Sequence, residues 1–301
     1  MKNTSRLFAL GTLASLLLLT ACGGGEDAAD MEVTIPDAPG AAIETIGKEL
    51  EKGNGGILWQ AMPASYQADL TAVAQLAGAK VDAELYNKGF AMVGRLAAVA
   101  DKQKEFILNS NLGGPRPPEQ IASIEAAWPS IIGFVETVAQ SPIASAEGLQ
   151  SFDGKEFSET TISSLIGYSE DLAALSGEPD PLQFGSVEVI ESTETTAQLE
   201  LKTPDGAVAA ENFTKVEGRW VPTEMASGWS ASMAQAKAQL ESLTAEDMAK
   251  NKPQILGVLT MLDGILTQIE AAETQAQFDQ SLQGAMMPLM GLFMMQQGMG
   301  Q

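Results

Sequence analysis

The spacing of apolar residues restricts the fold most, because it changes once along the chain and then changes back. From about residue 41 to 175, apolar side chains recur every three or four residues, which predicts helices. Between 187 and 221 they alternate with polar ones, which predicts strands, and after 223 the helical spacing returns. We therefore predict an α+β fold, mostly α-helical, with one small antiparallel β-meander (about residues 183–222) and a following helical pair.

Before the meander, helices are expected at about residues 41–50, from 63 onward, and at 83–100, 119–139 and 158–175, with a loop at 111–118. The 83–100 helix carries an apolar stripe that should face the core, made of Leu85, Phe90, Val93, Leu96 and Val99.

Prolines should interrupt two of the helical regions. Pro129 lacks the N–H that the preceding turn needs, so it should kink or divide the 119–139 helix. After the meander, Asn251-Lys252-Pro253 should separate helices at 225–243 and 255–270, and this short joint predicts an antiparallel hairpin.

The strands are expected around Val187–Val189, 197–201, 207–216 and 219–221, with tight turns at Pro204-Asp205-Gly206 and Glu217-Gly218. Short alternating strands joined in this way form an antiparallel meander with one solvated face. The closing Val216-Glu217-Gly218-Arg219-Trp220-Val221 resembles the sheet of NTF2-like domains. In that family helices precede a longer curved sheet, whereas here a helical pair follows the sheet.

The N-terminal segment has the pattern of a secretory signal. Lys2 and Arg6 precede an uncharged run from Leu7 to Leu19, which is too short to span a membrane. The residues that follow, Leu19-Thr20-Ala21-Cys22, resemble the lipobox of bacterial lipoproteins. The resemblance implies removal of residues 1–21, a diacylglyceryl group on the Cys22 thiol and acylation of its new amine. Gly23, where Asp would signal inner-membrane retention, implies the outer membrane, facing the periplasm.

The predicted organisation has four parts. A lipoprotein signal peptide at 1–21 precedes an acidic tether rich in Gly and Pro at 22–40. A single α+β domain follows at 41–283, with helices at 41–177, the meander at 183–222 and the helical pair at 223–283. Two helical lobes bridged by the sheet are the alternative. Residues 284–301 form a methionine-rich tail.

Composition excludes several kinds of chemistry. The chain has 17 Lys+Arg against 39 Asp+Glu, a net charge of −22, which repels phosphates and argues against nucleic acid as a partner. It contains no histidine and a single cysteine, which excludes Ser-His-Asp and Cys-His nucleophiles and imidazole or thiolate metal sites. No Ser-x-x-Lys is present, so only enzymes that work with carboxylates remain, and no cofactor is expected.

The tail has the most unusual composition, with five methionines between Gly284 and Met295. Met287, Met290 and Met294 would share one helical face, and their thioethers could hold Cu(I) in an oxidising compartment. The same face could instead form an adaptable surface for a partner. We expect a third outcome, a terminal helix that packs on the preceding helical pair and stabilises the domain.

Four aromatic residues are candidates to line a pocket near the sheet: Trp59, Tyr66, Trp128 and Trp220. Core packing is the alternative for each of them. Carboxylate pairs such as Glu246-Asp247 are plentiful, but their spacing in the sequence cannot place two acids in one cleft.

Two classes of function remain. The first is a membrane-anchored envelope lipoprotein, held through the lipid on Cys22, with a structural or protein-interaction role and another envelope protein as its partner. The alternative is a periplasmic small-molecule-binding protein, or a carboxylate-only hydrolase, with a pocket beside the sheet.

Overall fold

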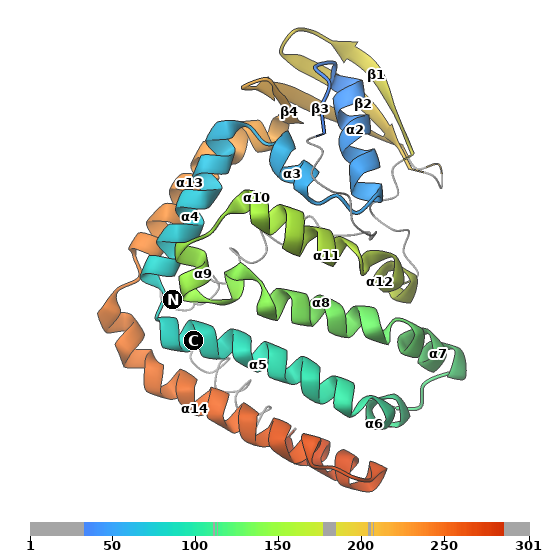
Figure 1. Ribbon diagram of the computed structural model, residues 1–301, viewed down its shortest axis with the longest axis vertical. Coiled ribbons are helices and arrows are strands. Elements are labelled where there is room, and N and C mark those ends of the chain that lie inside the picture. Colours follow the sequence, from blue (N-terminus) through green and yellow to red (C-terminus); the bar gives the residue numbers. More distant parts are fainter. Residues whose placement is uncertain are drawn as a thin grey trace, which may run out of the picture.

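The computed structural model describes residues 33–110, 112, 114–176, 185–203, 206 and 208–285. Helices lie beside one another in a slab, and a small sheet covers one end of it (Figure 1). Before the sheet come α2 (Pro39–Glu51), α3 (Gly56–Ala61), α4 (Ala64–Lys80), α5 (Ala83–Lys102), α6 (Lys104–Asn109), α7 (Pro118–Ala126), α8 (Trp128–Gln140), η2 (Pro142–Ala144), α9 (Ala146–Gln150), α10 (Gly154–Phe157), η3 (Ser158–Ile162), α11 (Ser163–Ile166) and α12 (Ser169–Ser176). After it come α13 (Thr223–Glu241), α14 (Ala245–Glu270) and a helix at residues 275–285.

The predicted meander is confirmed, and with it the α+β fold class. Strands β1 (Ser186–Ser192), β2 (Thr196–Lys202), β3 (Val208–Val216) and β4 (Arg219–Pro222) form one antiparallel sheet in the order β1-β2-β3-β4. Glu217 and Gly218 both have positive φ, 50° and 80°, which is the backbone of a two-residue hairpin turn matched to the twist of the strands. The inner face, with Leu199 and Phe213, packs on Ala42 of α2.

The last residues of the predicted tether, 33–40, are part of the packed structure. Ile35 contacts the apolar cluster of the sheet, and α2 already begins at Pro39. The Trp220 indole donates to the Asp37 carbonyl oxygen at 2.7 Å, and the Lys215 ammonium pairs with the Asp37 carboxylate. The chain therefore enters the domain along the sheet.

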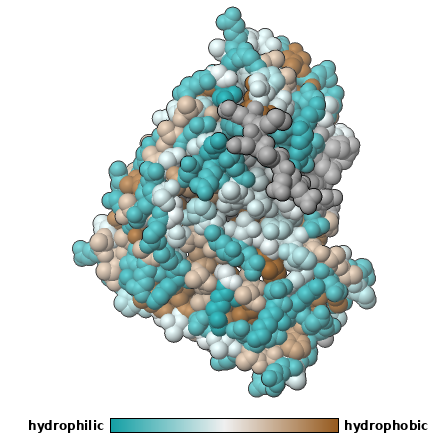
Figure 2. Space-filling view, viewed as in Figure 1, coloured by the Kyte–Doolittle hydropathy of each residue, from teal (hydrophilic) through white to brown (hydrophobic). Residues whose placement is uncertain are grey.

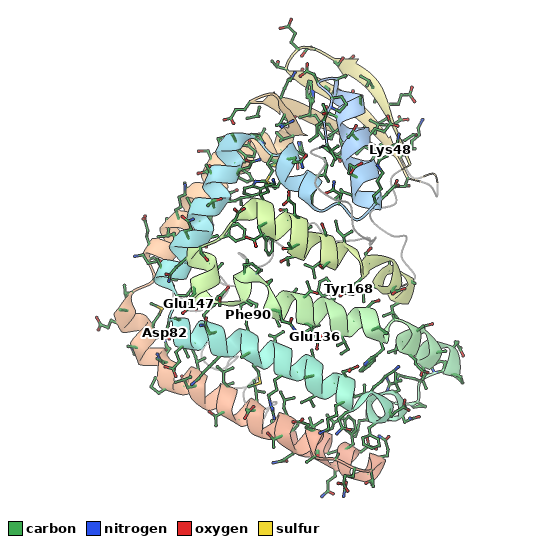
Figure 3. All side chains as sticks on the ribbon, in the orientation of Figure 1. Lys48, Asp82, Phe90, Glu136, Glu147 and Tyr168 are labelled. Atoms are coloured by element: carbon green, nitrogen blue, oxygen red, sulfur yellow. The ribbon has the colours of Figure 1, made fainter. Side chains whose placement is uncertain are left out.

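The two helices after the sheet do not form the expected antiparallel hairpin. Instead α13 packs on α4 and α14 packs on α5 (Figure 1). Lys252, early in α14, pairs with Asp82 at the start of α5, whereas Glu270, at the end of α14, pairs with Lys102 at the end of α5. The helices α5 and α14 therefore run in parallel, and α13–α14 follows the course of α4–α5. Figure 3 labels Asp82 at this junction.

The expected break at Asn251-Lys252-Pro253 was also wrong, because α14 continues through Pro253 and the chain bends at residues 242–244 instead. A proline removes the hydrogen bond to the carbonyl four residues earlier, here that of Ala249. Both Pro253 and Ala249 are exposed, so water can solvate that carbonyl. The Lys252 ammonium, 2.9 Å from carboxylate oxygens of both Asp82 and Glu84, fixes the same turn against α5.

The division at Pro129 is confirmed. Helices α7 and α8 meet at Ala127 with a bend of 45°, and Pro129 lies in the first turn of α8, where its missing N–H does no harm. The helix expected at 158–175 is instead broken into α10, η3, α11 and α12. Tyr168, labelled in Figure 3, follows α11 and reaches α8, where a Cβ on Gly133 would lie 2.6 Å from its ring.

The largest apolar cluster lies between α4, the α9–α11 region and α13, and includes Val73, Leu149, Ile166 and Met233. Smaller clusters lie under the sheet, between α6 and α8, and where α5 meets the end of α14.

Candidate functional site

The four aromatic pocket candidates lie in different parts of the molecule. Trp59 lies over Gly154, so closely that a Cβ there would overlap its ring. Trp128 is buried between α6 and α8 and donates from its indole to Asp101 at 3.1 Å. Trp220 lies in the sheet against α2. The fourth, Tyr66, stacks on Trp229, which sequence spacing did not pair with it.

Tyr66 lies in a hollow of about 440 Å³ between α4 and α13. Its ring is parallel to that of Trp229, with centroids 3.9 Å apart and planes inclined by 6°. Asp69, one turn along α4, accepts hydrogen bonds from the Lys237 ammonium at 2.8 Å and from the Trp229 indole at 3.1 Å. The bond from Lys237 lowers the pKa of Asp69, and the indole bond adds to this.

This pairing restricts the chemistry of the hollow. A carboxylate with a lowered pKa that already accepts two donors is a poor general base near neutral pH. Asp69 is the only acid among the described residues that line the hollow. Through its two hydrogen bonds Asp69 joins α4 to α13.

A second hollow, of about 530 Å³, lies where α5 and α6 meet α14 and the helix at residues 275–285. We call it the α5–α14 groove; its walls include Leu96, Val99, Leu112, Leu266, Phe278 and Leu282. Most of its lining is apolar, yet Leu96 is 53% exposed and Leu112 is 38% exposed. Figure 2 shows hydrophobic atoms among hydrophilic ones on the visible side of the helices α5 and α14.

Leu96 and its neighbour Val93 correct a prediction. Both belong to the apolar stripe of α5 that was expected to face the core, and both are exposed to solvent. Only Val99 in that stripe is buried, in the cluster with Ile269 and Phe278. The exposed part of the stripe is an apolar surface that no described part of the chain covers.

A buried polar side chain joins the helices next to the groove. Gln103, between α5 and α6, donates from its amide nitrogen toward the carbonyl oxygens of Ile269, Glu270 and Ala272 at 3.0, 2.9 and 3.2 Å. These carbonyls belong to the end of α14, where helical partners run out. Phe278, only 1% exposed, packs beside Phe106 of α6 with ring centroids 5.8 Å apart.

The helix at 275–285 was missed from the sequence, although a local signal marks its start. Gln277 donates its backbone N–H to the Thr274 hydroxyl at 3.3 Å, and its side-chain oxygen accepts from Glu273 N–H at 2.8 Å. This Thr-x-x-Gln arrangement is a form of capping box. Thr244-x-x-Asp247 is the same kind of sequence signal before α14.

Two arginines lie in or near the groove. Arg95 pairs with Asp263 at 2.8 Å and with Glu270 at 3.3 Å, bridging α5 and α14. Arg116, which lines the groove, donates to the carbonyl oxygens of Ile107 and Ser110 at 2.6 and 3.0 Å. These bonds join Arg116 to the end of α6 and to the residue that follows it.

The remaining candidates, Cys22 and the tail methionines Met287, Met290 and Met294, lie outside the described residues. Within the described part of the chain, no group of three or more Asp, Glu, His or Cys residues could hold a metal ion. There too, no single helix has the length and apolar character to cross a membrane; α7 and α8 pass that test only together, bent by 45°.

Comparison with known proteins found no matching family model, no matching curated protein and no matching solved structure.

Proposed function

We propose that the mature chain is an envelope lipoprotein, anchored through lipid on Cys22, with a non-catalytic role in protein interaction. The α5–α14 groove is the observation that carries the interaction part of this proposal. The lipobox residues Leu19-Thr20-Ala21-Cys22 support the anchor, and Gly23 supports the outer membrane, facing the periplasm. A net charge of −22 supports a lipid anchor over charge-driven attachment to anionic lipid.

The partner class follows from the shape and chemistry of the groove. The two helices α5 and α14 run in parallel and are joined by the Arg95–Asp263 pair, and α5 exposes Leu96 and Val93. Such a surface can bind the apolar face of a helix. Exposed contiguous apolar surface on a charged protein commonly marks an interaction site. We therefore assign an amphipathic helix of another envelope protein as the occupant.

The position of the lipid anchor determines where the α5–α14 groove lies relative to the membrane. The described chain begins at residue 33 on the sheet, and the sheet lies at the opposite end of the molecule from α14 (Figure 1). Residues 22–32, even fully extended, reach on the order of 40 Å. The sheet would therefore lie nearer the membrane than the groove, and the groove would be accessible to partners in the periplasm.

Site-specific photocrosslinking in intact cells tests the groove. A photoreactive amino acid replaces Leu96 in one strain and Val208, on the sheet, in another. These residues are a matched pair, because they are 53% and 56% exposed. The proposal expects a protein adduct from position 96 that is missing from position 208, with the crosslink mapped to an apolar helix face. The same adducts from both positions, or none from position 96, would contradict it.

Mass spectrometry of the mature N-terminus tests the anchor separately. It should show a first residue Cys22 that carries acyl chains, and Cys22→Ser should leave the precursor uncleaved or release the protein from membranes. An unmodified protein that begins at another residue would overturn the anchor and leave the groove result standing.

A further inference from the structure

We infer that the C-terminal segment Met286–Met295 docks in the α5–α14 groove of its own chain, so that a partner must displace it. The docking stands on the groove itself, whereas the displacement rests on the proposed function.

The direction of the chain brings the segment to the groove. In the helix at 275–285, Phe278 clusters with Ile269, and three residues later the Ser281 hydroxyl donates to the Gln268 carbonyl at 3.5 Å. This helix therefore runs antiparallel to α14. The axis of this helix points back along α14, on the side where Leu96 and Leu282 line the same groove.

The sequence continues the apolar stripe that lines the groove. Phe278 and Leu282 form part of the wall, and Met286, Met290 and Phe293 follow Leu282 at steps of four, four and three residues. Such steps keep side chains on one face of a helix, and Pro288 within the stretch would bend that helix because it lacks an N–H. The apolar spacing of the wall therefore continues in the sequence of the segment.

The chemistry of the segment matches an apolar site. In a chain with 39 acidic residues, none follows Asp279, and no basic residue follows Lys252. Methionine side chains are long and unbranched, so they fill irregular apolar hollows. Docking within one chain also gains from a high effective concentration, in the millimolar range for short connections.

Crosslinking within the chain tests the docking. Cys22 is the only cysteine, so Cys22→Ser gives a full chain without thiols. Into this background we place Met290→Cys with either Leu96→Cys or the matched surface control Val208→Cys, and apply a short bis-maleimide. Docking predicts an intramolecular product for the first pair that exceeds the control on the order of tenfold. Equal yields, no product, or a product only between two chains would overturn it; the last result would make a second copy the occupant.

Competition tests the displacement. The probe is a labelled synthetic peptide of residues 284–301, added to the full chain and to the full chain carrying Met290→Asp and Phe293→Asp. The substituted tail should free the groove, so the peptide should bind that variant on the order of tenfold more tightly. Adding Leu96→Asp to the same variant should abolish the gain. Equal binding to both chains would refute displacement. Neither assay depends on lipidation or on a natural partner, so failure here is distinguishable from failure of the proposed function.

Discussion

Gln103 should be worth far more to stability than an ordinary polar residue, because it connects two parts of the chain that are distant in sequence. Its side chain is 4% exposed, and its amide nitrogen lies within 3.2 Å of three carbonyl oxygens at the end of α14. The substitution Gln103→Met keeps the length of the side chain but removes both N–H donors. It therefore tests the hydrogen bonds with little change in packing.

The expected magnitude follows from the number of donors. The amide has two N–H groups, so at most two full hydrogen bonds are lost, shared among three acceptors. Losing a hydrogen bond while its buried partner stays unsatisfied costs about 1–3 kcal/mol. Water reaches part of this end of α14, since Glu270 is not fully buried. We expect Gln103→Met to lower the free energy of unfolding by about 2–4 kcal/mol.

Urea unfolding followed by circular dichroism measures this loss. Gln283→Met is the matched control, because Gln283 is exposed on the helix at 275–285. It should change the free energy of unfolding by less than about 0.5 kcal/mol. A loss below about 0.5 kcal/mol for Gln103→Met, or equal losses for both variants, would refute the view that Gln103 holds the base of the groove.

Two further predictions test other parts of the fold. Gly154→Ala should destabilise the chain by about 1–3 kcal/mol, because the new Cβ would overlap the Trp59 ring. Gly89→Ala, in an α5 turn where nothing lies within 4 Å of the new Cβ, should stabilise it by about 0.5–1 kcal/mol. Thermal unfolding compares them, and the same sign for both would contradict the packing argument. Asp69→Asn should destabilise the chain by about 1 kcal/mol near neutral pH. The bond from Lys237 lowers the folded-state pKa of Asp69, so its contribution is present above the unfolded-state pKa and is lost as pH falls through the folded one. Unfolding measured from neutral pH to about pH 2 should show the difference shrinking, and a difference that stays constant would exclude this linkage.

The sequence predicted the helices and strands of this fold better than it predicted which of them pack together. Alternation of side chains was sufficient for the strands, because a half-buried strand must show period two. Pro129 divided its helix as expected, since the chain could place it in the first turn of α8. Pro253 did not end its helix, because its surroundings are exposed and Lys252 is held by two carboxylates of α5. That contact is long-range and leaves no trace in local spacing.

The groove could not be predicted for a related reason. Periodicity shows that Val93 and Leu96 share an apolar face of α5, but it does not show whether another element covers that face. Coverage depends on where α14 and the helix at 275–285 lie, and the expected hairpin of α13 and α14 would have placed them differently. The aromatic candidates failed to gather for the same reason: Tyr66 stacks on Trp229 only because α13 runs along α4.

The parallel course of α5 and α14 also explains why the apolar side chains of Leu96 and Val93 are exposed on α5. The helix α14 runs alongside α5 as far as its end at Glu270. Only a segment that follows Glu270 can therefore cover the line of contact between these two helices. The helix at 275–285 runs back along α14 and covers Val99 and Ile269, whereas Leu96 of α5 is 53% exposed. The ten residues from Met286 to Met295 would extend about 15 Å as a helix, nearly three more turns. Along α5 that length covers about ten residues, from Leu96 past Val93 to about residue 86, so the segment is long enough to cover both exposed side chains.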